Sequence, residues 1–110
     1  MPRYLSTLNL SADAYKGLVA NPHNRMDAAA PLFQSIGGTL EHYWFGVGET
    51  IIYVVFSAPD NSVDVQALTM AVLSSGIAST MTTRQIVTAE EGMASAQKAA
   101  QLTYRPPTET

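Results

Sequence analysis

The segment TLEHYWFGVGETIIYVVFSA, residues 39–58, decides the fold. It divides at Gly48-Glu49 into two stretches, residues 39–47 and 50–58, that are rich in the aromatic and β-branched residues typical of strands. Because a glycine at the first position of a two-residue turn fits the type II′ geometry, the segment predicts a tight antiparallel hairpin. The second stretch is apolar at odd and even positions alike, which predicts a central strand covered on both faces.

Segments on both sides of this hairpin complete an alternating pattern. Residues 3–9 (RYLSTLN) and 78–87 (ASTMTTRQIV) predict a first and a fourth strand. Between the strands, apolar residues recur every three or four positions over residues 11–36 and again over residues 63–74, which predicts helices. The resulting order βαββαβ is the ferredoxin-like α+β plan, a four-stranded antiparallel sheet with two helices on one face.

Two prolines and a pair of glycines subdivide the first helical region. Pro22 cannot continue a helix, so we expect a short helix followed by a second one, with Asn21 as its cap and Pro22 at its first position. Pro31 is then an interior proline and predicts a kink. Gly37-Gly38 is expected to end the second helix.

The C-terminal region predicts one additional helix and a tail. Thr88 and Glu91 have the T-x-x-E spacing of a capping box, and a narrow apolar face follows them. The last residues contain Pro106-Pro107 and favour an extended chain. We therefore expect one domain over residues 1–101 and an extended tail over residues 102–110.

The composition points to self-association. Charged residues make up 14% of the chain, where soluble domains have about 25%. Two helices cover one face of a four-stranded sheet, whereas the third strand is apolar on both of its faces. We therefore expect the open face to pack on a second copy, which gives a homodimeric α/β barrel.

Several classes of function are disfavoured. The net charge is −3 and the six basic residues are scattered singly, which argues against nucleic-acid binding. The longest wholly apolar run, residues 51–56, is far shorter than a membrane helix, and the first residues do not resemble a signal peptide, so the expected location is the cytoplasm. There is no cysteine and no phosphate-binding or nucleotide-binding motif, so we expect neither a metal nor a cofactor.

The strand at residues 39–47 carries the most suggestive side chains. Strict alternation would place Leu40, His42 and Trp44 on one face and Glu41, Tyr43 and Phe45 on the other. Histidine is the side chain suited to proton transfer near neutral pH, so His42 could act as a general base or proton donor, although most isolated histidines are structural. Tyr43 and Trp44 could line an apolar pocket, or could simply belong to the core or to a dimer interface.

Four further polar residues are placed to reach a cavity. Tyr53 and Ser57 share one side of the third strand, where a cavity or a single cross-sheet hydrogen bond would explain them equally well. Arg84 could hold a carboxylate or a polarised carbonyl oxygen, or could form a surface ion pair. Asn9 could reach a cavity mouth or lie beside a helix cap. The candidate catalytic residues are therefore His42, Arg84 and Tyr53, and the candidate pocket residues are Asn9, Tyr43, Trp44 and Ser57.

The sequence resembles the GYD domain family, small bacterial proteins of the dimeric α/β-barrel superfamily. The resemblance covers nearly everything before the tail and rests on the order of these segments: residues 1–4 (MPRY), 25–29 (RMDAA), 37–40 (GGTL) with 43–44 (YW), Gly48, 58–60 (APD), and 82–84 (TTR) with 88–91 (TAEE). The family's G-x-Y-D signature is expected at the hairpin, where this chain has Gly48-Glu49-Thr50-Ile51. Its Tyr and Asp are absent, so no role attached to them applies here.

The resemblance implies no settled activity, and relatives in the superfamily include cofactor-independent monooxygenases and isomerases. Two functions are therefore carried forward, and whether the chain is an enzyme is left open. In the first, the protein binds or transforms a small apolar or aromatic metabolite, with proton transfer by His42 and stabilisation of negative charge by Arg84 or Tyr53. In the second, it is a non-catalytic dimeric assembly module.

Overall fold

The fold was determined as a computed structural model that describes residues 1–108. Along the chain it consists of β1 (Arg3–Leu10), α1 (Ala12–Ala20), α2 (Arg25–Gln34), β2 (Thr39–Phe45), β3 (Ile51–Ser57), α3 (Ser62–Ser74), β4 (Ala78–Ile86) and α4 (Ala89–Ala99). The predicted order βαββαβ with an added C-terminal helix is confirmed. Within residues 1–108 no helix is both long and apolar enough to cross a membrane.

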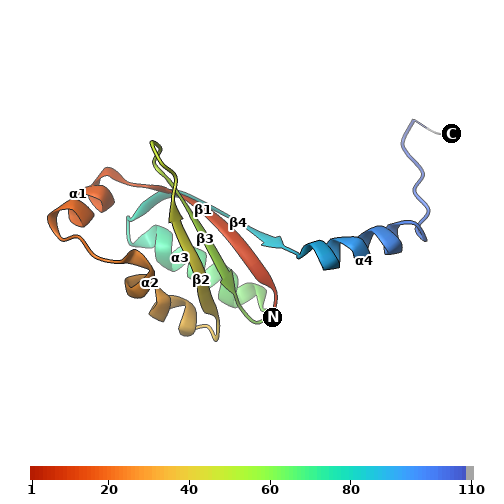
Figure 1. The fold of residues 1–110 in the computed structure, drawn as a ribbon, viewed down its shortest axis with the longest axis horizontal. Coiled ribbons are helices and arrows are strands. Elements are labelled where there is room, and N and C mark those ends of the chain that lie inside the picture. The colour runs from red at the N-terminus through yellow and green to blue at the C-terminus, as the bar shows by residue number, and fades with distance from the viewer. Residues whose placement is uncertain (109–110) are drawn as a thin grey trace.

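The four strands form one antiparallel sheet in the order β2-β3-β1-β4. This is the ferredoxin-like arrangement, in which each helix-containing crossover returns the chain to a non-adjacent strand. Helices α2 and α3 lie together on one face of the sheet, α2 against β2 and α3 against β4 (Figure 1). No helix of residues 1–108 covers the opposite face, which is called the open face below.

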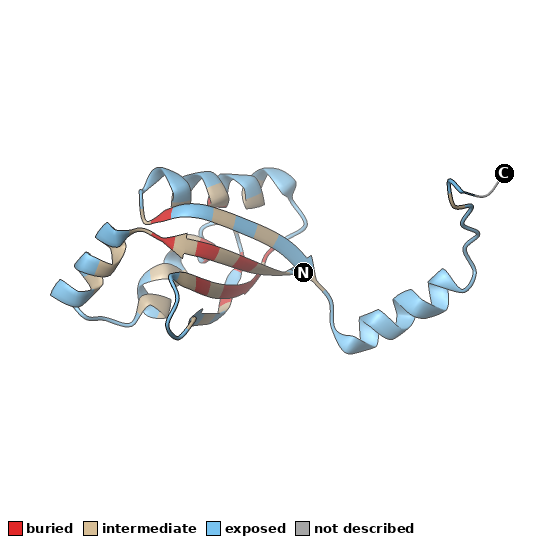
Figure 2. Cartoon of the chain, turned by 90° about the horizontal axis from the view of Figure 1, so that it is seen from above, coloured by how far each residue is buried: buried red, intermediate tan, exposed pale blue. Residues whose placement is uncertain are grey.

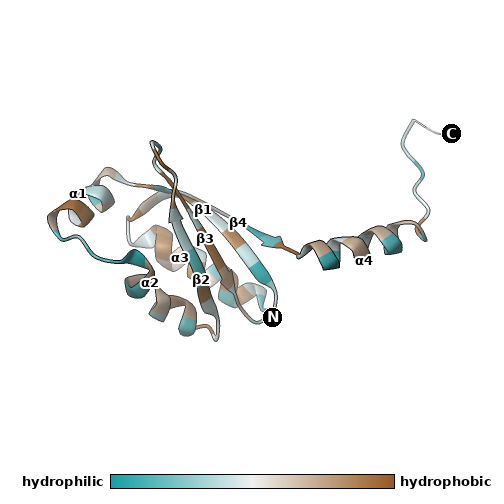
Figure 3. Ribbon diagram, in the orientation of Figure 1, coloured by the Kyte–Doolittle hydropathy of each residue, from teal (hydrophilic) through white to brown (hydrophobic). Residues whose placement is uncertain are grey.

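The core lies between the sheet and these two helices. Leu8 on β1 and Ile52, Val54 and Phe56 on β3 alternate inward and are buried, as the red bands on the strands show (Figure 2). Phe56 is 0% exposed, and the centroid of its ring lies 5.1 Å from the ring centroid of Tyr4 and 4.9 Å from that of Phe33. Val55, on the open face of the same strand, is only 8% exposed, so β3 is apolar on both faces as predicted, and most of the strand is coloured as hydrophobic in Figure 3.

The boundary between the first two helices differs from the prediction. The backbone N–H of Asn21 donates to the carbonyl of Gly17 (3.0 Å), so Asn21 ends α1 and is not available to begin the next helix. Asn24 is the N-cap of α2, because its side-chain oxygen accepts from the backbone N–H groups of Met26 and Asp27. The expectation that Asn21 and Pro22 begin the second helix is therefore wrong. Pro31 does lie inside that helix.

The hairpin is confirmed, but its turn is longer than predicted. Strand pairing ends where the N–H of Gly46 donates to the carbonyl of Ile51 (2.9 Å), which leaves four residues in the loop instead of two. The N–H of Glu49 donates to the carbonyl of Gly46 (3.4 Å), and this places Gly48 at the third position of a β-turn with φ +79°. Glycine is favoured there because it tolerates positive φ.

A bulge in β2 corrects the predicted assignment of its side chains to the two faces. Leu40 pairs with Phe56 whereas His42 pairs with Val55, so Glu41 is an extra residue with no partner. The alternation therefore shifts by one position at Glu41. Leu40 faces the helices together with Tyr43 and Phe45, and His42 and Trp44 lie on the open face. The carboxylate of Glu41 accepts two hydrogen bonds from the guanidinium of Arg3 (2.8 and 3.1 Å), which holds the bulged residue in place.

The C-terminal helix stands away from the rest of the molecule. The predicted capping box is present: Thr88 Oγ1 accepts from the Glu91 N–H, and Glu91 Oε1 accepts from the Thr88 N–H, each at 3.1 Å. Every residue of α4 is exposed, and the helix projects from the end of β4 (Figures 1 and 2). Residues 102–108 contain neither helix nor strand, and Glu109 and Thr110 of the predicted tail lie outside the described residues.

Gly38 is required by the close approach of α2 to the end of β3. A Cβ atom at Gly38 would lie 2.5 Å from the carbonyl oxygen of Ser57 and 3.2 Å from that of Phe33. We expect Gly38→Ala to lower the free energy of unfolding by about 1–3 kcal/mol, measured by urea denaturation. Gly17→Ala is the control, because a Cβ there meets no atom within 4 Å; it should raise stability by about 0.5–1 kcal/mol. Equal effects of the two substitutions would contradict this packing.

Candidate functional site

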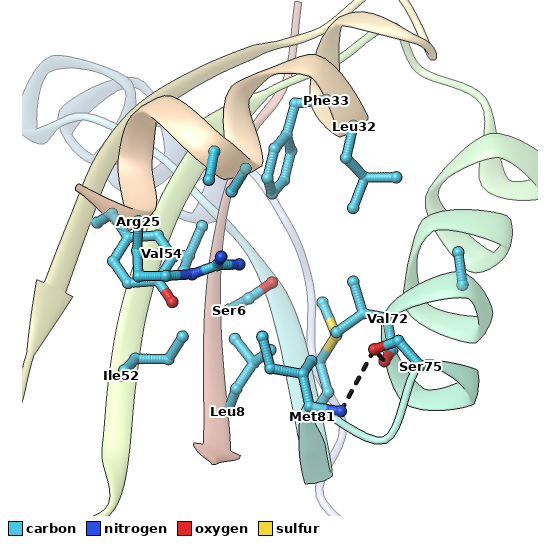
Figure 4. A pocket seen from close by; sticks show the side chains of 15 residues that line it. Ser6, Leu8, Arg25, Leu32, Phe33, Ile52, Val54, Val72, Ser75 and Met81 are labelled. Atoms are coloured by element: carbon cyan, nitrogen blue, oxygen red, sulfur yellow. Dashed lines mark hydrogen bonds between the residues drawn. The ribbon is translucent and has the colours of Figure 1, made fainter. Parts of the chain in front are cut away.

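A cavity of about 230 Å³ lies between the sheet and helices α2 and α3 (Figure 4). Its lining comes from six elements and from the turn after α3: Ser6, Leu8, Arg25, Ala28, Ala29, Leu32, Phe33, Tyr43, Ile52, Val54, Ala71, Val72, Ser75, Ile77 and Met81. Most of these side chains are aliphatic or aromatic. The site is therefore an apolar pocket with a few polar groups, the composition typical of small-molecule sites.

Two of the polar groups already have hydrogen-bond partners. Ser6 is 0% exposed, and its hydroxyl shares a 2.7 Å hydrogen bond with that of Thr83. Ser75 donates to the carbonyl of Val72 (2.6 Å) and accepts from the N–H of Ile77 (3.3 Å). Their hydrogen bonds within the protein explain both hydroxyls, so neither requires a ligand.

Arg25 differs, because one of its donors is unpaired. It is the first residue of α2, and its side chain points into the cavity (Figure 4). One terminal nitrogen donates to Nε2 of His23 (3.0 Å), whose Nδ1 then donates to the carbonyl of Asn21 (2.8 Å). The Nε of Arg25 is buried, with no acceptor among residues 1–108. A buried unpaired donor costs about 1–3 kcal/mol, and more for a charged group, so an acceptor at this point would be stabilising.

Tyr43 brings a phenol to the same cavity. Burial raises the pKa of its hydroxyl, and the neighbouring guanidinium of Arg25 offsets part of that increase. The phenol therefore remains protonated at neutral pH and can donate a hydrogen bond. The sequence suggested both Tyr43 and Trp44 as pocket residues. Only Tyr43 lines this cavity, because neighbouring strand residues point to opposite faces: Tyr43 faces the helices and Trp44 lies on the open face.

The three candidate catalytic residues lie outside this cavity, on the open face. His42 is exposed and stacks on Trp44, with ring centroids 4.6 Å apart. The Tyr53 hydroxyl donates to Glu49 Oε1 (2.6 Å), and this bond raises the pKa of Tyr53. Arg84 is exposed on β4, opposite Leu5 of β1.

The sheet does not bring His42 and Arg84 together within one protomer. They lie on β2 and β4, the two edge strands, with β3 and β1 between them. Three inter-strand spacings of about 4.8 Å separate such positions by about 14 Å. Asn9 and Ser57, the other predicted pocket residues, also lie on the open face, near opposite ends of the β1–β3 pair.

Comparison with known proteins identifies the family. The profile of the GYD domain matches residues 4–96, which is most of the chain. This chain belongs to the GYD domain family. Among solved structures, the fold is similar to the crystal structure of protein Atu4242 from Agrobacterium tumefaciens, with 14% identity, a TM-score of 0.48, and coverage of 81% of this chain and 94% of that one. No curated protein matches the sequence.

Sequence reasoning missed Arg25 as a cavity residue of this GYD-domain protein. A signal was present, because Arg25, Ala28, Ala29 and Leu32 recur at helical spacing and all four line the cavity. The cation therefore lies on the face of α2 that packs on the sheet, where an apolar residue is usual. No group of three His, Asp or Glu side chains within residues 1–108 is arranged to hold a metal ion.

Proposed function

We propose that this GYD-domain protein binds a small apolar molecule in the cavity between its sheet and helices. The observation that carries the proposal is the apolar cavity of about 230 Å³ with Arg25 and Tyr43 in its wall. The pocket opens to solvent beside the exposed Ala71, so a small molecule can enter it. A concave apolar wall with a few polar groups is the form that small-molecule sites usually take.

The size and lining of the cavity indicate the kind of ligand. Pockets for drug-sized molecules are about 300–1,000 Å³, so this one suits a smaller molecule. Ala28, Ala29 and Ala71 make room for it, while Leu8, Val54 and other aliphatic side chains surround it. Such walls favour a short aliphatic chain or a single aromatic ring over a sugar or a nucleotide.

The proposed assembly is a homodimer in which the open faces of two sheets meet. The open face is apolar and aromatic along β2 and β3, with Trp44, Ile51, Tyr53 and Val55, and more polar along β1 and β4, with Thr7, Thr82 and Arg84. Trp44 is 53% exposed, which is unusual for so large an apolar side chain in a stable protomer. Arg3 and Glu41 form an ion pair with each other, so Arg84 is the cation of this face that a second copy would have to pair or leave at the rim.

The exposure of every residue of α4 also favours a second copy of the chain as the partner. An eleven-residue helix is only marginally stable alone in water, so a helix of this length normally needs packing. Met93 is 59% exposed, and Leu102 and Tyr104 beyond the helix are more exposed still. We propose that α4 packs on the partner protomer, because a twofold axis lets each copy supply a helix and receive one.

Catalysis by side chains of the open face is a more specific proposal. Proton transfer by His42, with Arg84 or Tyr53 stabilising developing charge, would make the protein an isomerase or a cofactor-independent monooxygenase. His42 and Arg84 lie on the two edge strands and do not converge in one protomer, so chemistry that uses both needs the facing protomer to complete a site. The alternative is that the open face serves assembly alone, which the stacking of His42 on Trp44 favours.

Titration with toluene tests the cavity. In 1H–13C spectra of the methyl-bearing side chains, we expect shifts for Leu8, Val54 and Met81. Ala71 is an exposed residue of α3 at the cavity wall, so the larger side chain of Ala71→Phe should fill the entrance. We expect toluene binding to weaken about tenfold, which corresponds to a loss of about 1.4 kcal/mol of binding free energy.

Ala67→Phe is the matched control, because Ala67 lies one turn earlier on α3 and does not line the cavity. It should leave toluene binding unchanged. Shifts confined to His42 and Trp44, or equal effects of the two substitutions, would overturn the proposed location and favour a site on the open face.

A further inference from the structure

We infer that Arg25 binds the carboxylate of an apolar monocarboxylic acid in the cavity. The inference rests on the proposed function and specifies the class of ligand. It follows from three features of the site: the unused donor of Arg25, the absence of a protein counter-ion, and the apolar character of the remaining wall.

The donor geometry favours a carboxylate. The guanidinium offers its N–H groups in one plane, and adjacent groups match the two oxygens of a carboxylate. His23 accepts from one terminal nitrogen, which orients the guanidinium, while Nε stays buried without an acceptor within residues 1–108. A carboxylate beside Nε would supply the missing acceptor, and the protonated Tyr43 phenol lies in the same wall to donate a second hydrogen bond.

The charge of the site fits a single negative charge. Arg25 is the one Lys or Arg among the residues that line the cavity, and within residues 1–108 no carboxylate lies within ion-pair distance of it. Asp13 shares with Arg25 and His23 the lining of a neighbouring cavity, but forms no ion pair with Arg25. One unneutralised cation pairs with a monoanion; a phosphate monoester would bring a second charge that nothing in the wall would balance.

The rest of the wall selects an apolar body. Beyond Arg25 and Tyr43, the ligand would meet Leu32, Val54 and Val72, along with other aliphatic side chains. A polar body would leave its own hydrogen-bonding groups unsatisfied there, which penalises hydroxy acids and amino acids. The class is therefore an aryl or short alkyl carboxylic acid.

The test compares each acid with its neutral amide, using the full-length protein. Benzoate, phenylacetate and hexanoate are titrated beside benzamide, phenylacetamide and hexanamide, with 1H–15N spectra locating the binding and giving Kd. We expect at least one acid to bind tenfold or more tightly than its amide. Arg25→Met should remove this preference while the amide still binds, because the methionine keeps the apolar stem and lacks the charge.

Arg84→Met is the matched control, since Arg84 is an exposed cation on the open face and does not line the cavity. It should leave the preference intact, and loss of the preference in Arg84→Met alone would transfer carboxylate binding to the open face. The Arg25→Met spectrum also reports whether the variant is folded; should it be unfolded, Arg25→Lys replaces it and should reduce the preference by losing the paired donors. Equal affinities of acids and amides would overturn the inference and leave the cavity proposal standing, whereas no binding of either would overturn both.

Discussion

Thr7→Lys is expected to dissociate the proposed homodimer and leave the protomer folded. Thr7 lies on β1 at the middle of the open face, between Tyr53 on β3 and Thr82 on β4. In the isolated protomer the new ammonium group reaches water, and such surface changes alter stability by no more than about 0.5 kcal/mol. Between two sheets it would be buried without a counter-ion, at a cost of several kcal/mol. Sedimentation velocity should show the dimer Kd rising at least about 100-fold.

Gln85→Lys is the control for added charge. Gln85 is exposed on β4 and pairs with Tyr4 on the side of the sheet that faces the helices. This variant should sediment as the unmodified protein does. A protein that is monomeric before any substitution, or a Thr7→Lys variant that stays dimeric, would rule out assembly through the open face.

Removal of residues 88–110 should weaken the dimer by about 100-fold while the sheet remains folded. In this truncated chain the body keeps its core, because none of the buried core residues lies beyond Ala78. The lost side chains include Met93, Leu102 and Tyr104, and full burial of one large apolar side chain contributes about 1.5–3 kcal/mol. Sedimentation gives the change in Kd, and urea denaturation of the monomer checks the body.

Two point variants separate the contact of α4 from the loss of chain length. Met93→Glu places a charge on the apolar face of α4, and Ser95→Glu places it on the other side of the same helix. Only Met93→Glu should weaken the dimer. If truncation leaves Kd unchanged, or both glutamates act alike, α4 does not pack on a second copy.

Much of the fold could be predicted from local patterns. The residues around the hairpin and the capping box at Thr88 and Glu91 specify their elements through short-range chemistry, and the structure confirms both. The order of strands and helices then restricts the sheet to few topologies. The start of α2 was harder, because Asn21 and Asn24 are equally good caps by type and only the hydrogen bond from Asn21 to Gly17 separates them.

The site was harder to predict than the fold, for a physical reason. The faces of β2 depend on one unpaired residue, Glu41, and its position follows from pairing with β3 and from the ion pair with Arg3, thirty-eight residues away. The local alternation of polar and apolar residues in the sequence does not reveal an ion pair with a residue so far along the chain. Arg25 was overlooked because a cation at a helix start is ordinary on a surface, and only the closure of α2 over the sheet makes it a cavity residue.

The bulge at Glu41 also has an evolutionary consequence. Before the bulge, Leu40 of β2 packs in the core. After it, successive side chains alternate between the cavity and the open face, so Tyr43 lines the cavity and its neighbour Trp44 lies on the open face. A single-residue insertion or deletion before His42 would exchange the two faces, so that the indole of Trp44 would enter the cavity and the phenol of Tyr43 would leave it. Length changes at this point, more than substitutions, are therefore a route by which one member of a lineage could acquire a different ligand preference and a different partner surface in the same step.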